Sequence, residues 1–109
     1  MVDDLGWSDS GYQGSEILTP NIDKLATGGI RLDNYYVHSI CTPTRAQLLT
    51  GRYPIRYGFQ KGVLRPNQPR GIPLNEKLLP EAMKDCGYKT EMFGKWHVGM
   101  YHEDYQSRV

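Results

Sequence analysis

Three short segments of the chain have the apolar spacing and the end signals of helices. Residues 20–27 place apolar side chains three and four positions apart, after a Thr-Pro pair and before two glycines. Residues 42–50 begin with another Thr-Pro pair and end before a glycine. Residues 79–86 end before Gly87, a residue type that favours the left-handed end of a helix. We predict three helices here, the first capped by the Thr19 hydroxyl.

Two further segments have the pattern of strands. Residues 30–37 alternate apolar and polar side chains and then become aromatic and β-branched, and residues 88–93 also alternate. Residues 61–77 contain three of the seven prolines and no periodicity, which predicts a surface loop. Because helices and strands alternate along the chain, we predict an α/β fold with a mainly parallel sheet flanked by helices.

Composition narrows the class of protein. The 109 residues suffice for one small domain or part of a larger one, and 13 basic against 12 acidic residues leave a charge of +1. This balance gives no electrostatic reason to expect nucleic acid or an anionic membrane as a partner. No apolar run approaches the ~18 residues of a membrane span, so we expect no transmembrane segment. Two cysteines, Cys41 and Cys86, cannot form a disulfide framework, although one bridge between them remains possible.

The two ends of the sequence differ from the ends of a complete domain. Residues 1–7 have the character of a loop that follows a strand, yet no strand precedes them, and they lack the pattern of a signal peptide. Residues 102–109 stop without a helix cap or a polar tail. We therefore expect residues 1–109 to be a fragment, truncated at both ends. A complete small protein with frayed termini is the alternative interpretation.

Three polar clusters follow the expected strands. Asp3 and Asp4 follow the missing first strand, Cys41 follows the strand at 30–37, and Lys95 and His97 follow the strand at 88–93. Ligands of open α/β sheets bind beyond the carboxyl ends of the strands. We expect the three clusters to converge on one site.

The first cluster is a candidate metal site. Two adjacent carboxylates, those of Asp3 and Asp4, repel each other unless a cation lies between them, and their hard oxygen atoms suit Ca²⁺ or Mg²⁺ better than zinc. A solvated acidic turn is the alternative interpretation of this pair.

The second cluster lies at a predicted helix start. Cys41 occupies the positive end of the helix, where a thiolate or a bound oxyanion is stabilised, and Arg45 lies one turn further on the same face. A buried structural cysteine beside a surface arginine is the alternative, which describes Cys86 better than Cys41.

The third cluster is a candidate anion site. Lys95 and His97 would point to the same side of an extended chain, with Trp96 directed to the core. An ammonium and an imidazole in one pocket suit an anionic group. A solvated lysine and a histidine hydrogen-bonded within a loop fit the spacing equally well.

Together these segments resemble the N-terminal part of the sulfatases, in the alkaline-phosphatase-like superfamily. Residues 3–7 resemble the metal-binding opening of that family, and residues 94–97 resemble its second active-site motif. The family signature Cys-x-Pro-Ser/Thr-x-Arg, followed by Thr-Gly, is matched by Cys41, Pro43, Thr44, Arg45, Thr50 and Gly51. The resemblance extends over essentially all 109 residues.

The resemblance implies a mechanism. Cys41 would be oxidised to formylglycine by the formylglycine-generating enzyme in the endoplasmic reticulum, and the hydrated aldehyde would attack the sulfur of a sulfate ester. Ca²⁺ would be held by Asp3, Asp4 and the modified residue 41, Arg45 would orient the diol, and Lys95 would bind the sulfate charge. His97 would assist proton transfer. The substrates would be sulfated sugars such as glycosaminoglycans, or aryl sulfates, and the location would be lysosomal or extracellular.

In that family the remaining metal ligands, a second lysine and a further histidine lie beyond residue 109, so we expect residues 1–109 alone to be inactive. Three alternatives remain open from the sequence. One is a thiol hydrolase with an unmodified Cys41 paired to His97, and another is a phosphate or phosphonate monoester hydrolase of the same superfamily. The third is a catalytically silent homologue.

Overall fold

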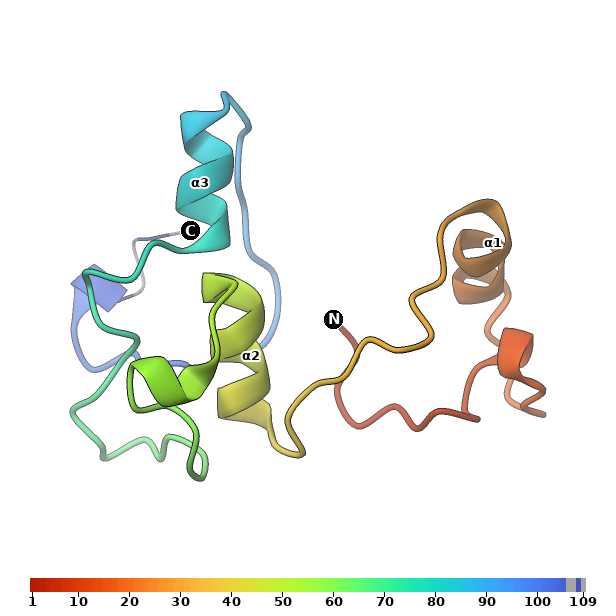
Figure 1. Cartoon of the computed structure of the whole chain (residues 1–109), viewed down its shortest axis with the longest axis horizontal. Coiled ribbons are helices and arrows are strands. Elements are labelled where there is room, and N and C mark those ends of the chain that lie inside the picture. Colours follow the sequence, from red (N-terminus) through yellow and green to blue (C-terminus); the bar gives the residue numbers. More distant parts are fainter. Residues whose placement is uncertain (106–107, 109) are drawn as a thin grey trace. The chain divides into compact units, whose positions relative to one another are not determined.

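The computed structural model describes residues 1–105 and residue 108, and it divides the chain into two compact units, Met1–Tyr36 and Val37–Val109. The first unit contains a 3-10 helix, η1 (Gly11–Gln13), and α1 (Pro20–Gly28). The second contains α2 (Cys41–Thr50), the 3-10 helix η2 (Pro54–Arg56), α3 (Leu79–Asp85) and the 3-10 helix η3 (Glu103–Tyr105). Figure 1 labels the three α-helices, of which α1 belongs to the first unit and α2 and α3 belong to the second.

The three predicted helices are confirmed, and each of their six ends lies within one residue of the predicted position. Gly51 ends α2 in the left-handed conformation with φ of 64°, and its N–H donates to the carbonyl of Gln47 at 2.9 Å. Gly87 follows α3 with φ of 84°. These are the positions where a glycine allows the helix to close its last turn without a steric penalty.

The prediction that the Thr19 hydroxyl caps α1 is wrong, because this hydroxyl bonds other groups. The Thr19 hydroxyl donates to Asp23 Oδ1 at 2.8 Å and accepts the N–H of Gly11 at 2.7 Å, so it bonds no backbone N–H of α1. Asp23 Oδ1 also accepts the N–H of Tyr12 at 2.9 Å. The two side chains therefore attach η1 to α1, because the N–H groups that they accept are those of Gly11 and Tyr12 in η1.

The predicted strands are wrong within the part of the chain that the structure describes, where no residue lies in a strand. Residues 30–37 form a turn and irregular backbone, and Ile30 and Tyr36 are 91% and 79% exposed. Residues 88–93 are irregular as well, and Phe93 is 89% exposed. The reason is that alternation predicts only which side chains share a face, whereas a strand also needs a hydrogen-bonded neighbour. The expected parallel sheet is therefore not seen in these residues.

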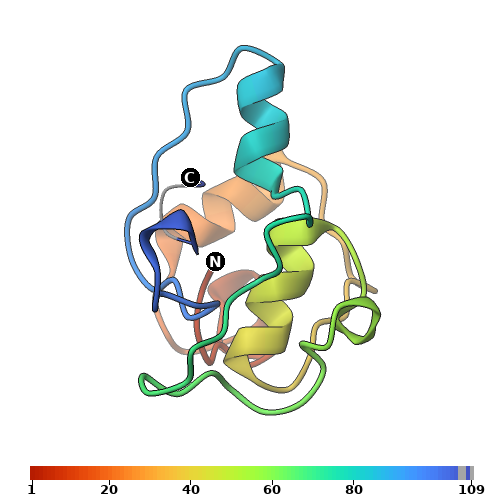
Figure 2. The same ribbon diagram turned by 90° about the vertical axis from the view of Figure 1, so that its left-hand side faces the viewer.

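The second unit has a small apolar core, and one face of α2 packs against it. Ala46 of α2 is fully buried, and α3 begins near the C-terminal end of α2 and contacts it (Figures 1 and 2). The core consists of Ala46, Phe59, Ile72, Leu78 and Val98, with Leu49, Tyr57, Leu64 and Trp96 packed against it.

Residues 61–77 are not simply the surface loop that the prolines predict. Ile72 and Glu76 are 1% and 6% exposed, and the N–H of Ile72 donates to the carbonyl of Val98 at 3.1 Å. One part of this segment thus packs into the core beside the chain that follows α3. That following chain leads from the end of α3 back toward the start of α2 (Figure 2).

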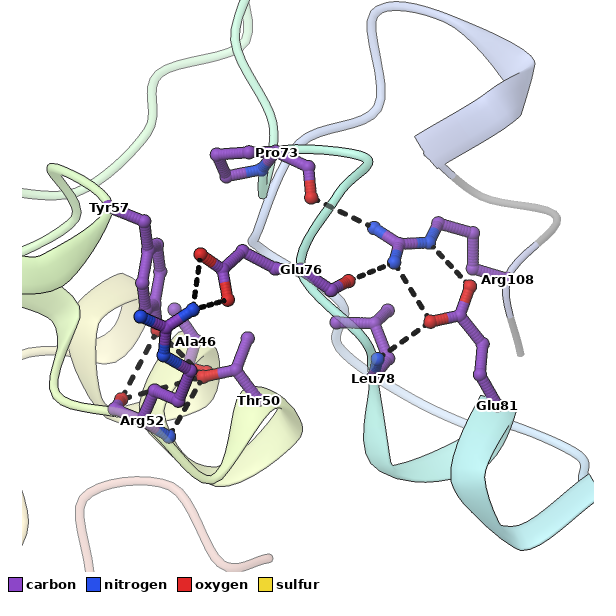
Figure 3. A network of polar contacts seen from close by, with 9 residues as sticks. All are labelled: Ala46, Thr50, Arg52, Tyr57, Pro73, Glu76, Leu78, Glu81 and Arg108. Atoms are coloured by element: carbon purple, nitrogen blue, oxygen red, sulfur yellow. Dashed lines mark hydrogen bonds and ion pairs between the residues drawn. The ribbon is translucent and has the colours of Figure 1, made fainter. Parts of the chain in front are cut away.

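A network of ion pairs surrounds this core (Figure 3). Arg52 Nη1 donates to both carboxylate oxygens of the buried Glu76, at 2.8 and 2.6 Å. Arg108 Nε and Nη2 donate to the two oxygens of Glu81, both at 2.8 Å, and Glu81 also accepts the N–H of Leu78 at the start of α3. The Arg108–Glu81 pair is bidentate, and the two ion pairs join the turn after α2, the 61–77 segment and α3 to residue 108.

The pair at Arg108 predicts a dependence of stability on acid. The hydrogen bond from Arg108 lowers the pKa of the Glu81 carboxyl, although burial opposes the shift. A carboxyl whose pKa is lower in the folded protein stabilises the fold at pH values above its unfolded-state pKa of about 4.3. This stabilisation is lost as the pH falls through the folded-state pKa. We expect Glu81→Gln to cost about 1 kcal/mol at neutral pH and to flatten the acid side of a thermal-unfolding profile. Glu91→Gln, at an exposed position, should keep the steep profile.

Gly71 predicts a second stability effect. A Cβ at this buried residue would collide with the ring of Tyr105, which lies directly on it. We expect Gly71→Ala to destabilise the protein by about 2 kcal/mol, because the ring must leave its position. Gly28→Ala is the control, since nothing lies within 4 Å of that Cβ and a change within about 0.5 kcal/mol is expected. Equal urea midpoints for the two variants would contradict this packing argument.

Candidate active site

The first turn of α2 holds the cysteine of the sequence motif. α2 begins at Cys41, one residue before the predicted start, and the preceding Ile40 has extended backbone with φ of −139° and ψ of 162°. Cys41 is half-buried, whereas Thr42 is 2% exposed and Pro43 is buried. The prediction that Cys41 lies at the positive end of a helix is confirmed. The N–H groups of this turn favour an anion or a polarised oxygen there.

Lys95 joins this helix start from a distant part of the sequence. Its Nζ donates to Sγ of Cys41 at 3.1 Å, and Arg45, one turn along α2, donates from Nη1 to the carbonyl of Lys95. Two of the three predicted polar clusters are thus in contact within the second unit. The Lys95 ammonium beside Sγ adds positive charge to the N-terminal end of α2, which the helix dipole already makes positive.

Thr42 fixes the geometry of this contact. Its hydroxyl donates to the carbonyl of His97 at 2.9 Å and accepts the N–H of Leu64 at 3.1 Å. One buried side chain, next to Cys41 in the sequence, therefore joins α2 to the loops that contain Leu64 and His97. The sequence interpretation used Thr42 only as the start of a helix. A threonine before a proline carries no further signal, so this role could not be found from the sequence.

His97 has a backbone conformation that the sequence did not indicate. Residues 95–97 were predicted as extended chain, but His97 has φ of 60°, in the left-handed region that few side chains adopt. The prediction is wrong because the chain turns at His97, so the alternation of an extended chain does not apply. Trp96 is half-buried and packs against the core, as predicted.

The ring of His97 is held by the main chain. Its Nε2 lies 2.9 Å from the carbonyl oxygen of Leu64, and a carbonyl can only accept, so Nε2 carries the hydrogen. Nδ1 is buried and has no hydrogen-bond partner among the described residues. In the neutral ring Nδ1 is then an acceptor, and protonation would make it a donor. This arrangement agrees with the alternative from the sequence, a histidine that is hydrogen-bonded within a loop. It also leaves Nδ1 as an acceptor for a ligand.

Asp3 and Asp4 lie in the first unit and are both exposed. Asp4 has φ of 61°, a conformation that aspartate and asparagine tolerate better than most residues. The two carboxylates fit Ca²⁺ in kind, because hard cations take oxygen ligands, but Ca²⁺ requires six to eight of them. No group of three or more metal-ligating side chains occurs in the part of the chain that the structure describes. That Asp3 and Asp4 join the Cys41 site stays a prediction.

The remaining sequence predictions concern cysteines and membrane helices. Neither Cys41 nor Cys86 forms a disulfide in the structure, and Cys86 is exposed just after α3. Among residues 1–105 and 108, none of the helices has the length and apolar character needed to cross a membrane.

A cysteine and a lysine in contact at a helix start, with an arginine one turn later, place a thiol beside two positively charged side chains, an arrangement that suits an anion. Comparison with known proteins identifies the protein family. The model of the sulfatase family matches residues 1–108, and the chain belongs to that family.

Curated relatives and solved structures agree with this assignment. Mouse arylsulfatase J is 52% identical over 104 residues, covering 95% of this chain and 17% of the relative. Human arylsulfatase A is 50% identical over 102 residues, covering 92% and 20%. The crystal structure of Ps i-CgsB in complex with k-i-k-neocarrahexaose matches with a TM-score of 0.88 at 38% identity, covering 97% of this chain and 24% of that one. The chain therefore spans about a fifth of the length of these curated relatives, and it shares the fold of the corresponding part of a solved structure.

Proposed function

We propose that this protein is a sulfuric ester hydrolase of the arylsulfatase type, with residue 41 as its nucleophile after conversion of the cysteine to formylglycine. The observation that carries the proposal is the contact of Lys95 Nζ with Cys41 Sγ at the start of α2. It joins the two motifs of the second unit in a chain that belongs to the sulfatase family. The formylglycine hydrate supplies a hydroxyl nucleophile and a second hydroxyl that allows sulfate to be released.

The residues around Sγ bind and orient a sulfate group. The ammonium of Lys95 would neutralise one sulfate oxygen, and the N–H groups of the first turn of α2 add partial positive charge. Arg45 donates to the carbonyl of Lys95, and so it keeps the lysine at the helix start while lying on the same face as residue 41. These groups are positioned before substrate arrives, which avoids the cost of reorganising them during the reaction.

His97 is suited to accept a proton. Because Nε2 donates to Leu64, the neutral ring presents Nδ1 as the free acceptor. We propose that Nδ1 takes a proton from a hydroxyl at residue 41 and later returns it, as general acid–base catalysis requires. The group that protonates the leaving alcohol is expected beyond residue 109.

We propose Ca²⁺ as the cofactor, with Asp3, Asp4 and the modified residue 41 among its ligands. Their oxygen atoms match its preference, and the ion would supply positive charge toward the sulfate oxygens. The remaining oxygen ligands are expected beyond residue 109, because two carboxylates and one residue do not fill its coordination sphere.

For the substrate we propose a sulfated sugar, with aryl sulfates as simpler substrates. Related proteins include human N-acetylgalactosamine-6-sulfatase, 43% identical over 108 residues and covering 21% of its length. Residues 33–36, 51–56 and 74–80 resemble arylsulfatase B, an N-acetylgalactosamine-4-sulfatase. On the same basis we propose maturation by the formylglycine-generating enzyme in the endoplasmic reticulum, and a lysosomal or extracellular location.

A hydrolase of phosphate or phosphonate monoesters is the alternative, since both anions are tetrahedral. The test compares turnover of 4-nitrophenyl sulfate and 4-nitrophenyl phosphate by the full-length protein, with calcium present. We expect kcat/KM to favour the sulfate by at least about a hundredfold, or roughly 2.7 kcal/mol of transition-state stabilisation. A preference for the phosphate would replace the proposal with the alternative, and no turnover of either would indicate a silent homologue.

A further inference from the structure

A cavity of about 110 Å³ lies in the second unit between residues 64–70 and residues 96–101. Its lining contains two arginines, a glutamine and two large aromatic side chains, and no acidic residue among the described ones. This set differs from the Cys41 site, because neither Cys41 nor Lys95 lines the cavity.

The cavity is nevertheless attached to that site by short contacts. Leu64 and His97 form part of its wall, and both bond the hydroxyl of Thr42, the residue next to Cys41. The ring of His97 also bonds the carbonyl of Leu64. The cavity and the Cys41 site are therefore neighbours in the second unit, joined through Thr42.

The two arginines of the lining differ in how they are held. Arg70 is fixed, because it donates from Nη2 to the carbonyl of Gly58 and lies 4.6 Å above the centre of the Phe59 ring. The guanidinium of Arg65 has no hydrogen-bond or ion-pair partner in the described part of the chain, although its N–H bonds Gln68 Oε1 at 2.9 Å. A positive group on a fixed turn, with no acidic neighbour in the cavity, suits an anionic ligand.

The aromatic side chains give the cavity its apolar wall. Trp96 packs against the core and donates from Nε1 to the carbonyl of Gly99 at 2.7 Å, which fixes its ring. Tyr101 is 51% exposed, and its ring lies 5.0 Å from that of Tyr105. Flat apolar surfaces combined with a few polar groups are typical of sites for small organic ligands.

We propose that this cavity is a subsite for an acidic sugar residue, next to the residue that bears the sulfate to be removed. A carboxylate or a second sulfate would pair with Arg65, and the sugar ring would lie against Trp96 and Tyr101. A volume of about 110 Å³ suffices for one such charged group and part of a ring, but not for a longer saccharide. The inference rests on the proposed function and specifies its substrate class as a polyanionic saccharide.

The test measures binding apart from turnover. A chondroitin 4-sulfate tetrasaccharide is titrated into full-length Cys41→Ala protein by calorimetry, with and without Arg65→Gln. We expect Arg65→Gln to raise Kd about fivefold, and this difference to shrink between about 50 mM and about 0.5 M salt. Arg56→Gln is the matched control, because Arg56 is exposed in the same unit and lies outside the cavity. An equal Kd for the two arginine variants, or no binding of the tetrasaccharide, overturns the inference.

Kinetics of the active protein separate this inference from the proposed function. Arg65→Gln should raise the ratio of KM for the tetrasaccharide to KM for 4-nitrocatechol sulfate about fivefold, with kcat on the tetrasaccharide changed less than about twofold. An equal rise of both KM values contradicts a subsite for the neighbouring sugar. Absence of turnover of 4-nitrocatechol sulfate contradicts the proposed function alone, since the calorimetric comparison does not depend on it.

Discussion

Replacing Cys41 by alanine is expected to lower kcat for an aryl sulfate by at least about 10⁴-fold, because the reaction then loses its nucleophile. The fold should survive the change. Cys41 is half-buried at the first position of α2, and alanine has the highest helix propensity of all residues. The measurement is kcat on 4-nitrocatechol sulfate together with the thermal midpoint of the same preparation.

The chain offers a matched control for this substitution. Cys86 likewise forms no disulfide in the structure but is exposed just after α3, and no element of the proposed site includes it. Cys86→Ala should keep kcat within about twofold of the starting protein. Comparable losses in the two cysteine variants would mean that residue 41 is not the nucleophile.

Replacing Asp4 by asparagine is expected to lower kcat by about 10³-fold at fixed calcium concentration, because a charged oxygen ligand is lost. Asparagine suits this position, since Asp4 has φ of 61° and asparagine tolerates that conformation as aspartate does. Loss of activity would then report the missing charge and not a strained main chain.

Calcium titration completes the Asp4 test. Part of the lost activity should return at high calcium, because a weaker site is filled by mass action. Asp33→Asn is the control, since Asp33 is an exposed aspartate of the same unit. Full activity of Asp4→Asn in calcium-depleted buffer would remove Asp4 from the metal site.

The sequence predicted the helices of this protein well because their ends are encoded locally. The glycines after α2 and α3 adopt the left-handed backbone that their position suggested, and Pro20 begins α1. The strands could not be predicted in the same way. Alternation at 30–37 and 88–93 describes one face of a segment, but pairing depends on a neighbouring segment, and the described residues supply none.

The site was predictable in its residue types and less so in its geometry. The motif placed Cys41 at a helix start and grouped it with Lys95, and the structure brings these two side chains into contact. It could not show that Thr42 bonds two loops, nor that His97 has φ of 60°. The two bonds of Thr42 join residues that are 22 and 55 positions apart, and such contacts leave no local pattern in the sequence.

The mass of residue 41 in protein from a secretory host tests the central claim most directly. Trypsin releases residues 32–45 as one peptide, and conversion of the thiol to an aldehyde lowers its mass by about 18 Da, whereas ordinary thiol oxidation raises it by about 16 Da or more. The peptide of residues 85–89 carries Cys86 and serves as the internal control. We expect the lower mass at residue 41 and an unmodified thiol at residue 86. An unmodified thiol at both, in active protein, would contradict the account.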